Sequence, residues 1–281
     1  VVSRGTARRT VKLAVPTAGK TGTTNEAKDV WFLGFTSNIV AGCYIGHDIP
    51  RPLGRGSGGG SMCGPVFNEF MSAVTEIYGG ADFIKEDEIM ADNGYLPLNE
   101  RVDVISNAIS KCNWKGVYAY CINADPYELC ENFKTINDHG GEACHINFWS
   151  GMGAYTTSNL YHVVTHFQRS GIRTWTDPGN KFSISWNVIV KLAIMAGVDS
   201  VHVGMLGGYY PEGESEEETL QAVSDLQNAD RVAALSCGMN PEIARQIRGN
   251  IGNNWMANVG GWLHTGENIY EKVYEMRKSL E

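Results

Sequence analysis

Several features are absent from this chain of 281 residues, and each absence narrows what the protein can be. It contains no run of Lys and Arg and carries a formal net charge of −8, which argues against nucleic acid as its main partner. No stretch of about 18 apolar residues occurs, so we predict no membrane span. The first five residues contain no apolar signal-peptide core and no initiator Met, as expected for a fragment or a processed product.

Cysteine motifs are also absent, although the chain has seven cysteines. No C-x-x-C pair occurs and the spacings are scattered, so the pattern favours neither a zinc site nor a disulfide framework. Free thiols are typical of a reducing compartment, and we therefore expect a cytoplasmic protein. The residues are Cys43, Cys63, Cys112, Cys121, Cys130, Cys144 and Cys237.

The front of the chain, up to a Gly- and Ser-rich stretch at residues 55–61, has the pattern of an antiparallel sheet. Apolar and β-branched runs at residues 11–15, 30–35 and 38–45 alternate with turns. The Gly/Ser stretch predicts a flexible loop or a linker. Apolar residues at helical spacing then predict a helix over residues 65–78, which Gly79 and Gly80 would end.

After residue 80 the pattern changes to a repeating βα unit, which predicts an α/β fold with a parallel sheet. Seven successive units suggest an incomplete (β/α)8 TIM-type barrel that lacks one strand. A doubly wound open sheet is the alternative, but no G-x-G-x-x-G opens a helix. The expected strands are residues 81–84, 116–122, 143–148, 172–175, 200–205, 232–235 and 255–259. The expected helices are residues 98–111, 126–139, 157–169, 185–196, 216–228, 241–249 and 268–280.

Polar residues gather at the expected C-terminal ends of these strands, where barrels of this type place their active sites. Glycine pairs near the last strands favour a phosphate site, because their backbone N–H groups can approach an anion. Each glycine alone can equally mark a turn, and a lone histidine can equally be a core residue. The polar residues and glycines are Lys85, Asp87, Glu88, His145, Asn147, His202, Gly204, Gly207, Gly208, Ser236, Gly238, Gly260 and Gly261.

The segment GGADFIKEDE at residues 79–88 carries the most specific chemistry. Lys85 and Asp87 are two apart, so on a strand they face the same side, and Glu88 joins them only if the chain bends. Hard cations need oxygen ligands, and a lysine fits such a site only if CO2 converts it to an anionic carbamate. The alternative is a strand end with a surface cluster of ion pairs.

This segment resembles the activation-lysine motif of the RuBisCO superfamily, which comprises true RuBisCOs and RuBisCO-like proteins. Four more stretches resemble the C-terminal barrel of RuBisCO-like proteins, so that the resemblance covers residues 73–281: CHINFWSGMGAY (144–155), GVDSVHVGMLGG (197–208), ALSCGMNP (234–241) and NWMANVGGWLHTG (254–266). The resemblance implies a carbamylated Lys85 that holds Mg2+ with Asp87 and Glu88. It also implies a homodimer. It further implies substrate or phosphate contacts from His202, Ser236, Gly238, Gly260 and Gly261.

Two departures from true RuBisCO bear on the reaction. The lysine of the loop after the sixth barrel strand is Tyr209 here, and a basic histidine after the fifth strand is matched to Trp175. Without the loop lysine a carboxylation transition state would lose its main cation. The resemblance therefore implies a Mg2+-dependent enzyme that forms a metal-stabilised enolate on a phosphorylated sugar or sugar acid, as a decarboxylase, a transcarboxylase-hydrolase or an isomerase.

The front of the chain carries a second resemblance. Lys20-Thr21-Gly22 predicts a K-T-G strand leading into a hairpin. With GTARR (5–9), GHDIPRPLG (46–54) and GGGSMCGPVFNEFM (58–71), it resembles the C-terminal portion of the transpeptidase domain of class A penicillin-binding proteins. The resemblance implies that Lys20 and Thr21 contact a substrate carboxylate. No S-x-x-K precedes Lys20, so the nucleophile is missing and only a remnant of that site is expected.

We therefore expect a chimera, with a β-rich transpeptidase-like fragment at residues 1–72 and a RuBisCO-like barrel at residues 73–281. The two resemblances meet within residues 67–78. The barrel match lacks the N-terminal domain and first strand of its family. Three hypotheses stay open: a Mg2+-dependent RuBisCO-like enzyme, a non-catalytic chimera of two partial folds, and a penicillin-binding fragment.

Overall fold

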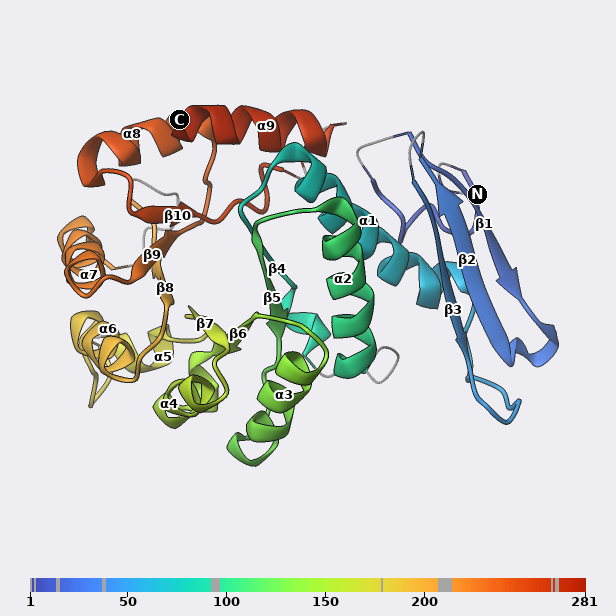
Figure 1. Ribbon diagram of the computed structural model, residues 1–281, viewed down its shortest axis with the longest axis horizontal. Coiled ribbons are helices and arrows are strands. Elements are labelled where there is room, and N and C mark those ends of the chain that lie inside the picture. The colour runs from blue at the N-terminus through green and yellow to red at the C-terminus, as the bar shows by residue number, and fades with distance from the viewer. Residues whose placement is uncertain are drawn as a thin grey trace. The chain divides into compact units, whose positions relative to one another are not determined.

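The computed structural model describes residues 2, 4–13, 16–36, 39–91, 97–177, 179–206, 214–263, 265 and 268–281 (Figure 1). The chain divides into two compact units. Val1–Ala81 with Leu263–Tyr274 form the first, here named the sheet unit. Asp82–Trp262 with Glu275–Glu281 form the second, here named the barrel unit. No helix among the described residues has the length and apolar character needed to cross a membrane.

The sheet unit contains an antiparallel sheet in the order β1-β2-β3. The strands are β1 (Ala18–Thr23), β2 (Asp29–Phe35) and β3 (Val40–Gly46), with a short 3-10 turn, η1 (Asn25–Ala27), between the first two. Side chains alternate along β2, so that Val30 and Phe32 are buried while Trp31 and Leu33 are exposed. The expected K-T-G strand is confirmed as β1. The strand expected at residues 11–15 is wrong for residues 11–13, which are not in a strand, and residues 14 and 15 lie outside the described residues.

Helix α1 (Gly64–Gly79) follows the π-helical turn η2 (Gly59–Cys63) and confirms the helix expected there. The residue after the helix, Gly80, has a φ of 88° and forms the left-handed C-cap that glycine adopts without strain. The buried side of α1 packs on the sheet, where the rings of Phe67 and Phe32 have centroids 4.7 Å apart. The core of this unit consists of Ala7, Val11, Val30, Phe32, Cys63, Phe67 and Met71.

The barrel unit contains a seven-stranded sheet in the order β10-β9-β8-β7-β6-β5-β4, in which neighbouring strands run parallel. The sheet curls into part of a barrel (Figure 1). Among the described residues β4 and β10 do not pair with each other, so the expectation of a barrel short of one strand is confirmed. The strands are β4 (Phe83–Lys85), β5 (Val117–Cys121), β6 (Ala143–Asn147), β7 (Val164–Gln168), β8 (Ser200–Gly204), β9 (Val232–Leu235) and β10 (Trp255–Ala257).

Helices cover the convex side of this sheet (Figure 1). Two of them begin at a side-chain cap: Ser215 forms a capping box with Glu218 at the start of α7, and the Asn240 side chain caps α8. The remaining helical elements are η3 (Glu88–Met90), α2 (Leu98–Cys112), α3 (Pro126–Asp138), η4 (Phe148–Ser150), α4 (Met152–Leu160), α5 (Arg173–Thr176), α6 (Trp186–Met195), α7 (Glu216–Asn228), α8 (Pro241–Ile251) and α9 (Ile269–Leu280).

The fourth βα unit differs from the sequence expectation. Residues 172–175, expected as a strand, lie largely in the short helix α5, and the strand is β7, inside the stretch expected as a helix at residues 157–169. Helix α4 ends at Leu160, and His162 then takes a positive φ of 56° that a helix does not allow. Strand β7 follows, and its residues Thr165, His166 and Phe167 are buried, so both faces of the strand are covered.

Candidate functional site

Lys85 lies at the C-terminal end of β4 and is half-buried. It faces the same side as Phe83, two residues earlier, because side chains alternate along a strand. The ring of Phe83 lies 5.6 Å, centroid to centroid, from the ring of His166 on β7. Since β4 and β7 are not adjacent in the sheet, this contact crosses the concave side. Lys85 therefore points into the interior of the curled sheet.

Three buried histidines surround this interior, one on each of three neighbouring strands. His145 on β6, His166 on β7 and His202 on β8 are 0%, 1% and 8% exposed. Burial, followed by the positive charge of Lys85, lowers the pKa of His166 to about 3. Burial is also the largest cause that lowers the pKa of His145 and His202, and Lys85 contributes to both. All three imidazoles are therefore neutral at physiological pH.

Hydrogen bonds connect these imidazoles to neighbouring residues. His166 Nδ1 lies 2.8 Å from Ser200 Oγ, and His202 Nε2 is hydrogen-bonded to Ser236 Oγ. Both ring nitrogens of His145, as well as His166 Nε2 and His202 Nδ1, are buried. Hydrogen bonding to the Glu86 backbone acts to raise the pKa of His145, and hydrogen bonding to the Gln168 side chain acts to raise that of His166, so neither ring is without a partner.

The acids that follow Lys85 have different surroundings. Asp87 is exposed, whereas Glu88 is half-buried at the start of η3, where the chain bends as a shared site requires. Glu88 Oε1 accepts a hydrogen bond of 2.5 Å from Ser170 Oγ, a residue that follows β7. The loops after β4 and β7 thus meet over the carboxyl ends of the strands.

Glu86, between Lys85 and Asp87, has a structural role that sequence reasoning missed. It is 3% exposed and its Oε2 accepts hydrogen bonds from Arg101 Nη1 at 2.9 Å and from the Cys121 backbone N–H at 2.8 Å. Arg101, also 3% exposed, donates further to the carbonyls of Met90 and Cys121. This buried pair fixes the backbone between Lys85 and Glu88. Successive side chains on a strand point to opposite faces, so Glu86 is expected to point away from Lys85, and this was the signal that the sequence offered.

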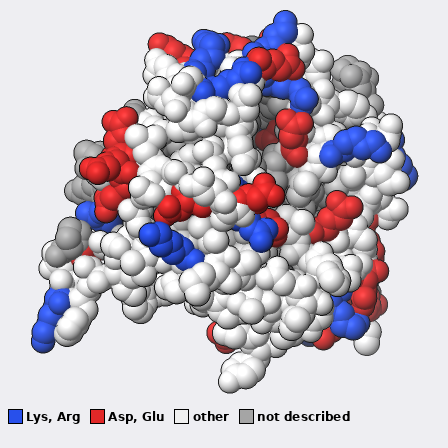
Figure 2. Space-filling model, turned by 60° about the vertical axis from the view of Figure 1, so that its left-hand side comes forward, with Lys and Arg blue, Asp and Glu red and all other residues white. Residues whose placement is uncertain are grey.

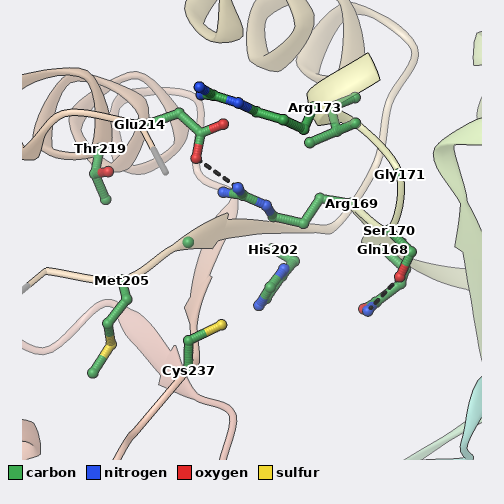
Figure 3. A pocket seen from close by; sticks show the side chains of 12 residues that line it. Gln168, Arg169, Ser170, Gly171, Arg173, His202, Met205, Glu214, Thr219 and Cys237 are labelled. Carbon is green, nitrogen blue, oxygen red and sulfur yellow. Dashed lines mark hydrogen bonds and ion pairs between the residues drawn. The ribbon is translucent and has the colours of Figure 1, made fainter. Parts of the chain in front are cut away.

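A cavity of about 280 Å3 opens at the carboxyl ends of β7, β8 and β9 (Figure 3). Ser170 lines it, and since Ser170 also binds Glu88, the cavity adjoins the Lys85 loop. His202, a predicted site residue, lines it too, as does Cys237, which lies between the predicted Ser236 and Gly238. The lining residues are Gln168, Arg169, Ser170, Gly171, Ile172, Arg173, His202, Gly204, Met205, Glu214, Thr219 and Cys237.

Arg169 is the main cation of this cavity and was missed because the sequence analysis placed it at the end of a helix. Its guanidinium pairs with Glu214 at 2.6 Å, donates to the Val203 carbonyl at 3.0 Å and lies 5.2 Å from the centre of the Trp186 ring. Figure 3 shows the pair with Glu214 at the cavity wall. The sequence analysis matched Trp175 to the residue that follows the fifth barrel strand of the family, and this match is wrong. The strand is β7, which Arg169 follows directly, whereas Trp175 lies in α5.

The remaining predicted residues follow the last two strands. Cys237 and Gly238 after β9 have φ values of 73° and 90°, so the backbone turns sharply next to Ser236. Gly260 and Gly261 after β10 are exposed, and a Cβ on either would meet no atom within 4 Å. This space leaves their backbone open to a ligand. Tyr209 and the glycines at 207 and 208 lie outside the described residues.

The K-T-G residues lie in the sheet unit. Lys20 is exposed, and its Nζ donates to the Thr21 carbonyl at 2.8 Å. Thr21 Oγ1 lies 2.8 Å from Thr6 Oγ1. A Cβ on Gly22 would lie 1.9 Å from the indole nitrogen of Trp31, so glycine is needed there for packing.

Acidic and basic side chains intermingle on the face seen in Figure 2, and no broad basic surface appears among the described residues there. This distribution agrees with the formal net charge of −8.

Comparisons with known proteins find two kinds of similarity in this chain. Residues 64–261 match the family described as ribulose bisphosphate carboxylase large chain, catalytic domain. Among solved structures, a rubisco-like protein from Burkholderia fungorum is similar with a TM-score of 0.63 and 21% identity, over 75% of this chain and 56% of that one. A rubisco-like protein (MtnW) from Alicyclobacillus acidocaldarius has a TM-score of 0.65 and 18% identity, over 76% and 57%. The dimeric archaeal Rubisco of Hyperthermus butylicus has a TM-score of 0.64 and 22% identity, over 75% and 56%.

Part of the chain is also similar to penicillin-binding protein 1A. The protein from Rickettsia bellii is 54% identical over 72 residues, which are 26% of this chain and 9% of that protein. The protein from Aquifex aeolicus is 36% identical over 137 residues, 48% of this chain and 18% of that protein. Both predicted resemblances are therefore confirmed. The chain spans little more than half of the similar structures and less than a fifth of the similar penicillin-binding proteins.

Proposed function

The chain belongs to the family of the ribulose bisphosphate carboxylase large chain, catalytic domain, and on this basis we propose that it is a Mg2+-dependent RuBisCO-like enzyme. Its substrate is a phosphorylated sugar or sugar acid, from which a proton or a carboxyl group is removed to give an enolate. The reaction is that of a decarboxylase, a transcarboxylase-hydrolase or an isomerase. The observation that carries the proposal is the meeting of the Lys85 loop and the β7 loop, through Glu88 and Ser170, over an interior lined with neutral histidines.

The donor set fits a hard cation only if Lys85 takes part. Asp87 and Glu88 provide carboxylates beside Lys85, and no group of three or more His, Cys, Asp or Glu able to hold a metal occurs among the described residues. A carbamate on Lys85 would add the missing anionic oxygen ligands. Bound there, Mg2+ would supply Lewis-acid stabilisation of the developing oxyanion.

The buried imidazoles also favour an anion at Lys85. The positive charge of Lys85 lowers the pKa of His145, His166 and His202. Carbamate oxygens at Lys85 would remove this charge and could accept a hydrogen bond from an imidazole N–H, which an ammonium cannot do.

The cavity at the ends of β7, β8 and β9 would hold the phosphorylated end of the substrate. Arg169 offers the guanidinium that suits phosphate, but Glu214 now occupies it at 2.6 Å. An entering phosphate would have to share Arg169 with this carboxylate, which favours substrates whose other contacts compensate. Ser236 and Gly238 at the turn after β9, with Gly260 and Gly261 after β10, would provide additional hydroxyl and backbone contacts.

Carboxylation is not part of this proposal. It rests on the sequence, in which Tyr209 stands where a true RuBisCO has its loop lysine. A homodimer belongs to the proposal as well, since the similar archaeal Rubisco is described as dimeric. The proposal also includes a cytoplasmic location.

The proposal is tested by 13C NMR of the protein with 13C-labelled bicarbonate and Mg2+. We expect a carbamate resonance that disappears in Lys85→Arg, which keeps the positive charge but forms no carbamate. Lys115→Arg, at an exposed lysine outside the site, is the matched control and should leave the resonance intact. Two activities should depend on the same lysine. One is the uptake of deuterium from D2O into ribulose 1,5-bisphosphate, and the other is the release of CO2 from a 3-oxo sugar-acid phosphate.

A carbamate signal that survives in Lys85→Arg would refute the ligand assignment. A carbamate without exchange or CO2 release would leave a metal-binding chimera without turnover, the second hypothesis. Failure of both readouts in a folded protein would reject the enzymatic function.

A further inference from the structure

The antiparallel sheet of the sheet unit has one face that points away from α1, and this face is apolar and exposed. Helix α1 packs on the opposite face, where Phe67 contacts Phe32. Side chains alternate along each strand, so every second residue of β2 and β3 points to the exposed face. The large apolar side chains there are Trp31, Leu33, Phe35, Val40 and Tyr44, which are 40%, 55%, 50%, 72% and 64% exposed.

These five side chains form one continuous patch, here named the apolar sheet face. Trp31 pairs in register with Tyr44, and Phe35 pairs with Val40, so β2 and β3 present them side by side. Leu33 lies between Trp31 and Phe35 on β2. Single exposed apolar residues are normal, but a contiguous patch of several hundred Å2 is typical of an interaction site.

The side chains of this face lie flat on the sheet and are held by their neighbours. The Trp31 indole covers Gly22 of β1, where a Cβ would overlap it. The Tyr44 ring stacks beside the indole, with an angle of 20° between the two planes. Leu33 covers Gly42 of β3, where a Cβ would lie 3.3 Å from Leu33 Cδ1. Side chains that are already fixed lose little conformational entropy when a partner binds.

The apolar sheet face is electrically balanced, although the whole chain has a formal net charge of −8. Within the three strands, Lys20 and Asp29 are the charged residues. Asp29 Oδ1 accepts a hydrogen bond of 2.7 Å from the Tyr44 hydroxyl, and Lys20 Nζ donates to the Thr21 carbonyl. Two copies can therefore bring these faces together without the repulsion that acidic surfaces would cause.

The area of this face suits a second copy of the chain. With their exposed fractions, the five side chains offer roughly 500 to 600 Å2. Two copies packed face to face would bury about 1,000 to 1,200 Å2, which is enough for a specific interface. Sheets pack in this way about 10 Å apart, with their strands within about 30° of each other. A flat face fits another flat face, and every copy of the chain supplies one.

We propose that two copies of the chain associate through the apolar sheet face, so that their β1-β2-β3 sheets stack. Aromatic side chains are enriched in the cores of protein interfaces, and three of the five side chains are aromatic. This interface is separate from the homodimer proposed for the RuBisCO-like enzyme, and it does not depend on the enzymatic function.

Sedimentation velocity over a wide range of protein concentrations tests the proposal. Leu33→Lys puts a charge at the centre of the face and should weaken one association step at least about tenfold, because the charge would be buried without a partner. Phe35→Thr keeps a residue that favours strands and should weaken the same step about tenfold. The matched control is Leu160→Lys, at a leucine of α4 that is 78% exposed, and it should leave this step unchanged.

Hydroxyl-radical labelling locates the interface independently. The tryptic peptide of residues 29–55 contains a single tryptophan and a single tyrosine, Trp31 and Tyr44. Both should become less labelled as the concentration of the wild type rises, and neither should change in Leu33→Lys. Circular dichroism of each variant checks that the chain is folded.

The proposal is overturned if the wild type sediments as a monomer at every concentration, or if Leu33→Lys associates as well as Leu160→Lys. It is also overturned if the labelling of Trp31 and Tyr44 does not change with concentration. The carbamate resonance of Lys85 should be the same in Leu33→Lys as in the wild type. The loss of that resonance would concern the proposed function, so the failures of the two proposals are distinguishable.

Discussion

Replacing Arg101 by Met should destabilise the barrel unit by about 3 to 5 kcal/mol, because it leaves the buried Glu86 carboxylate without its cation. Both side chains are 3% exposed, so solvent does not screen the pair. Methionine keeps much of the apolar stem of arginine and removes the charge. The substitution therefore measures the ion pair rather than a cavity.

The magnitude follows from the bonds that are lost. Glu86 Oε2 accepts from Arg101 Nη1 and from the Cys121 N–H, and after the substitution only the backbone bond remains of these two. Arg101 also donates to the carbonyls of Met90, at 2.6 Å, and Cys121, at 3.3 Å. Hydrogen bonds to charged groups contribute about 1.5 to 3 kcal/mol each, and they are not additive, so a total of about 3 to 5 kcal/mol is reasonable.

A double-mutant cycle separates the pair from its surroundings. Glu86→Gln removes the negative charge and should cost less than Arg101→Met, because the arginine keeps its two carbonyl acceptors. The double variant should be more stable than the sum of the single losses predicts, by about 1 to 3 kcal/mol. The control is Lys134→Met, which breaks an exposed i,i+4 pair with Asp138 at 2.5 Å and should cost at most about 0.5 kcal/mol.

The assay is urea unfolding followed by circular dichroism, together with hydrogen exchange of the Cys121 amide, which donates to Glu86. A loss of about 3 kcal/mol would speed exchange through the global opening roughly a hundredfold. The reasoning is refuted if Arg101→Met costs no more than Lys134→Met, or if the cycle is additive. In either case the Glu86–Arg101 pair would not fix the chain that presents Lys85.

Three further predictions concern stability. Burial and the charge of Glu69 raise the pKa of the half-buried Glu76 to about 7. The contribution of Glu76 to stability is therefore full below pH 4.5 and is lost as the pH rises through 7. The gain in unfolding free energy from Glu76→Gln should be about 1 to 2 kcal/mol larger at pH 8 than at pH 5. The pKa of His166 is lowered to about 3, so its contribution to stability is present above pH 6.5 and is lost as the pH falls toward 3. Within that range the unfolding free energy should fall by about 1.4 kcal/mol per pH unit. His166→Asn should reduce this slope in acid unfolding. Phe67→Ala should destabilise the sheet unit by about 3 to 5 kcal/mol in urea unfolding. Asn68→Ala, which removes the half-buried acceptor of a hydrogen bond from the Lys12 N–H, should cost only about 0.5 to 1.5 kcal/mol.

Periodicity and turn residues were enough to predict most of the barrel unit. The run at residues 232–235 and the amphipathic stretch at residues 216–228 coincide with β9 and α7, because the strand is short and apolar and the helix has a strong N-cap. The failure at β7 has a specific cause. Its sequence, Val-Thr-His-Phe-Gln, contains two polar residues that are nonetheless buried: the Thr165 hydroxyl is hydrogen-bonded to Ser158 on α4, and His166 Nδ1 to Ser200 on β8. A pattern of hydrophobicity cannot predict partners that are distant in sequence.

The site was predictable only as far as each strand end could be located. Lys85, His202 and Ser236 were found because their strands were placed correctly, and the structure brings His202 and Ser236 into hydrogen-bond contact. Arg169 was missed because its strand was not recognised. The bond between Ser170 and Glu88 joins residues 82 positions apart, so no local pattern could reveal it.

The interior of the curled sheet supports the carbamate proposed at Lys85. His145, His166 and His202 are buried there, and the positive charge of Lys85 lowers the pKa of all three. Conversion of Lys85 to an anion would remove the repulsion between this cation and protonated imidazoles, and it would offer acceptors for imidazole N–H groups. A carbamate and an anionic substrate are therefore the groups that this arrangement favours.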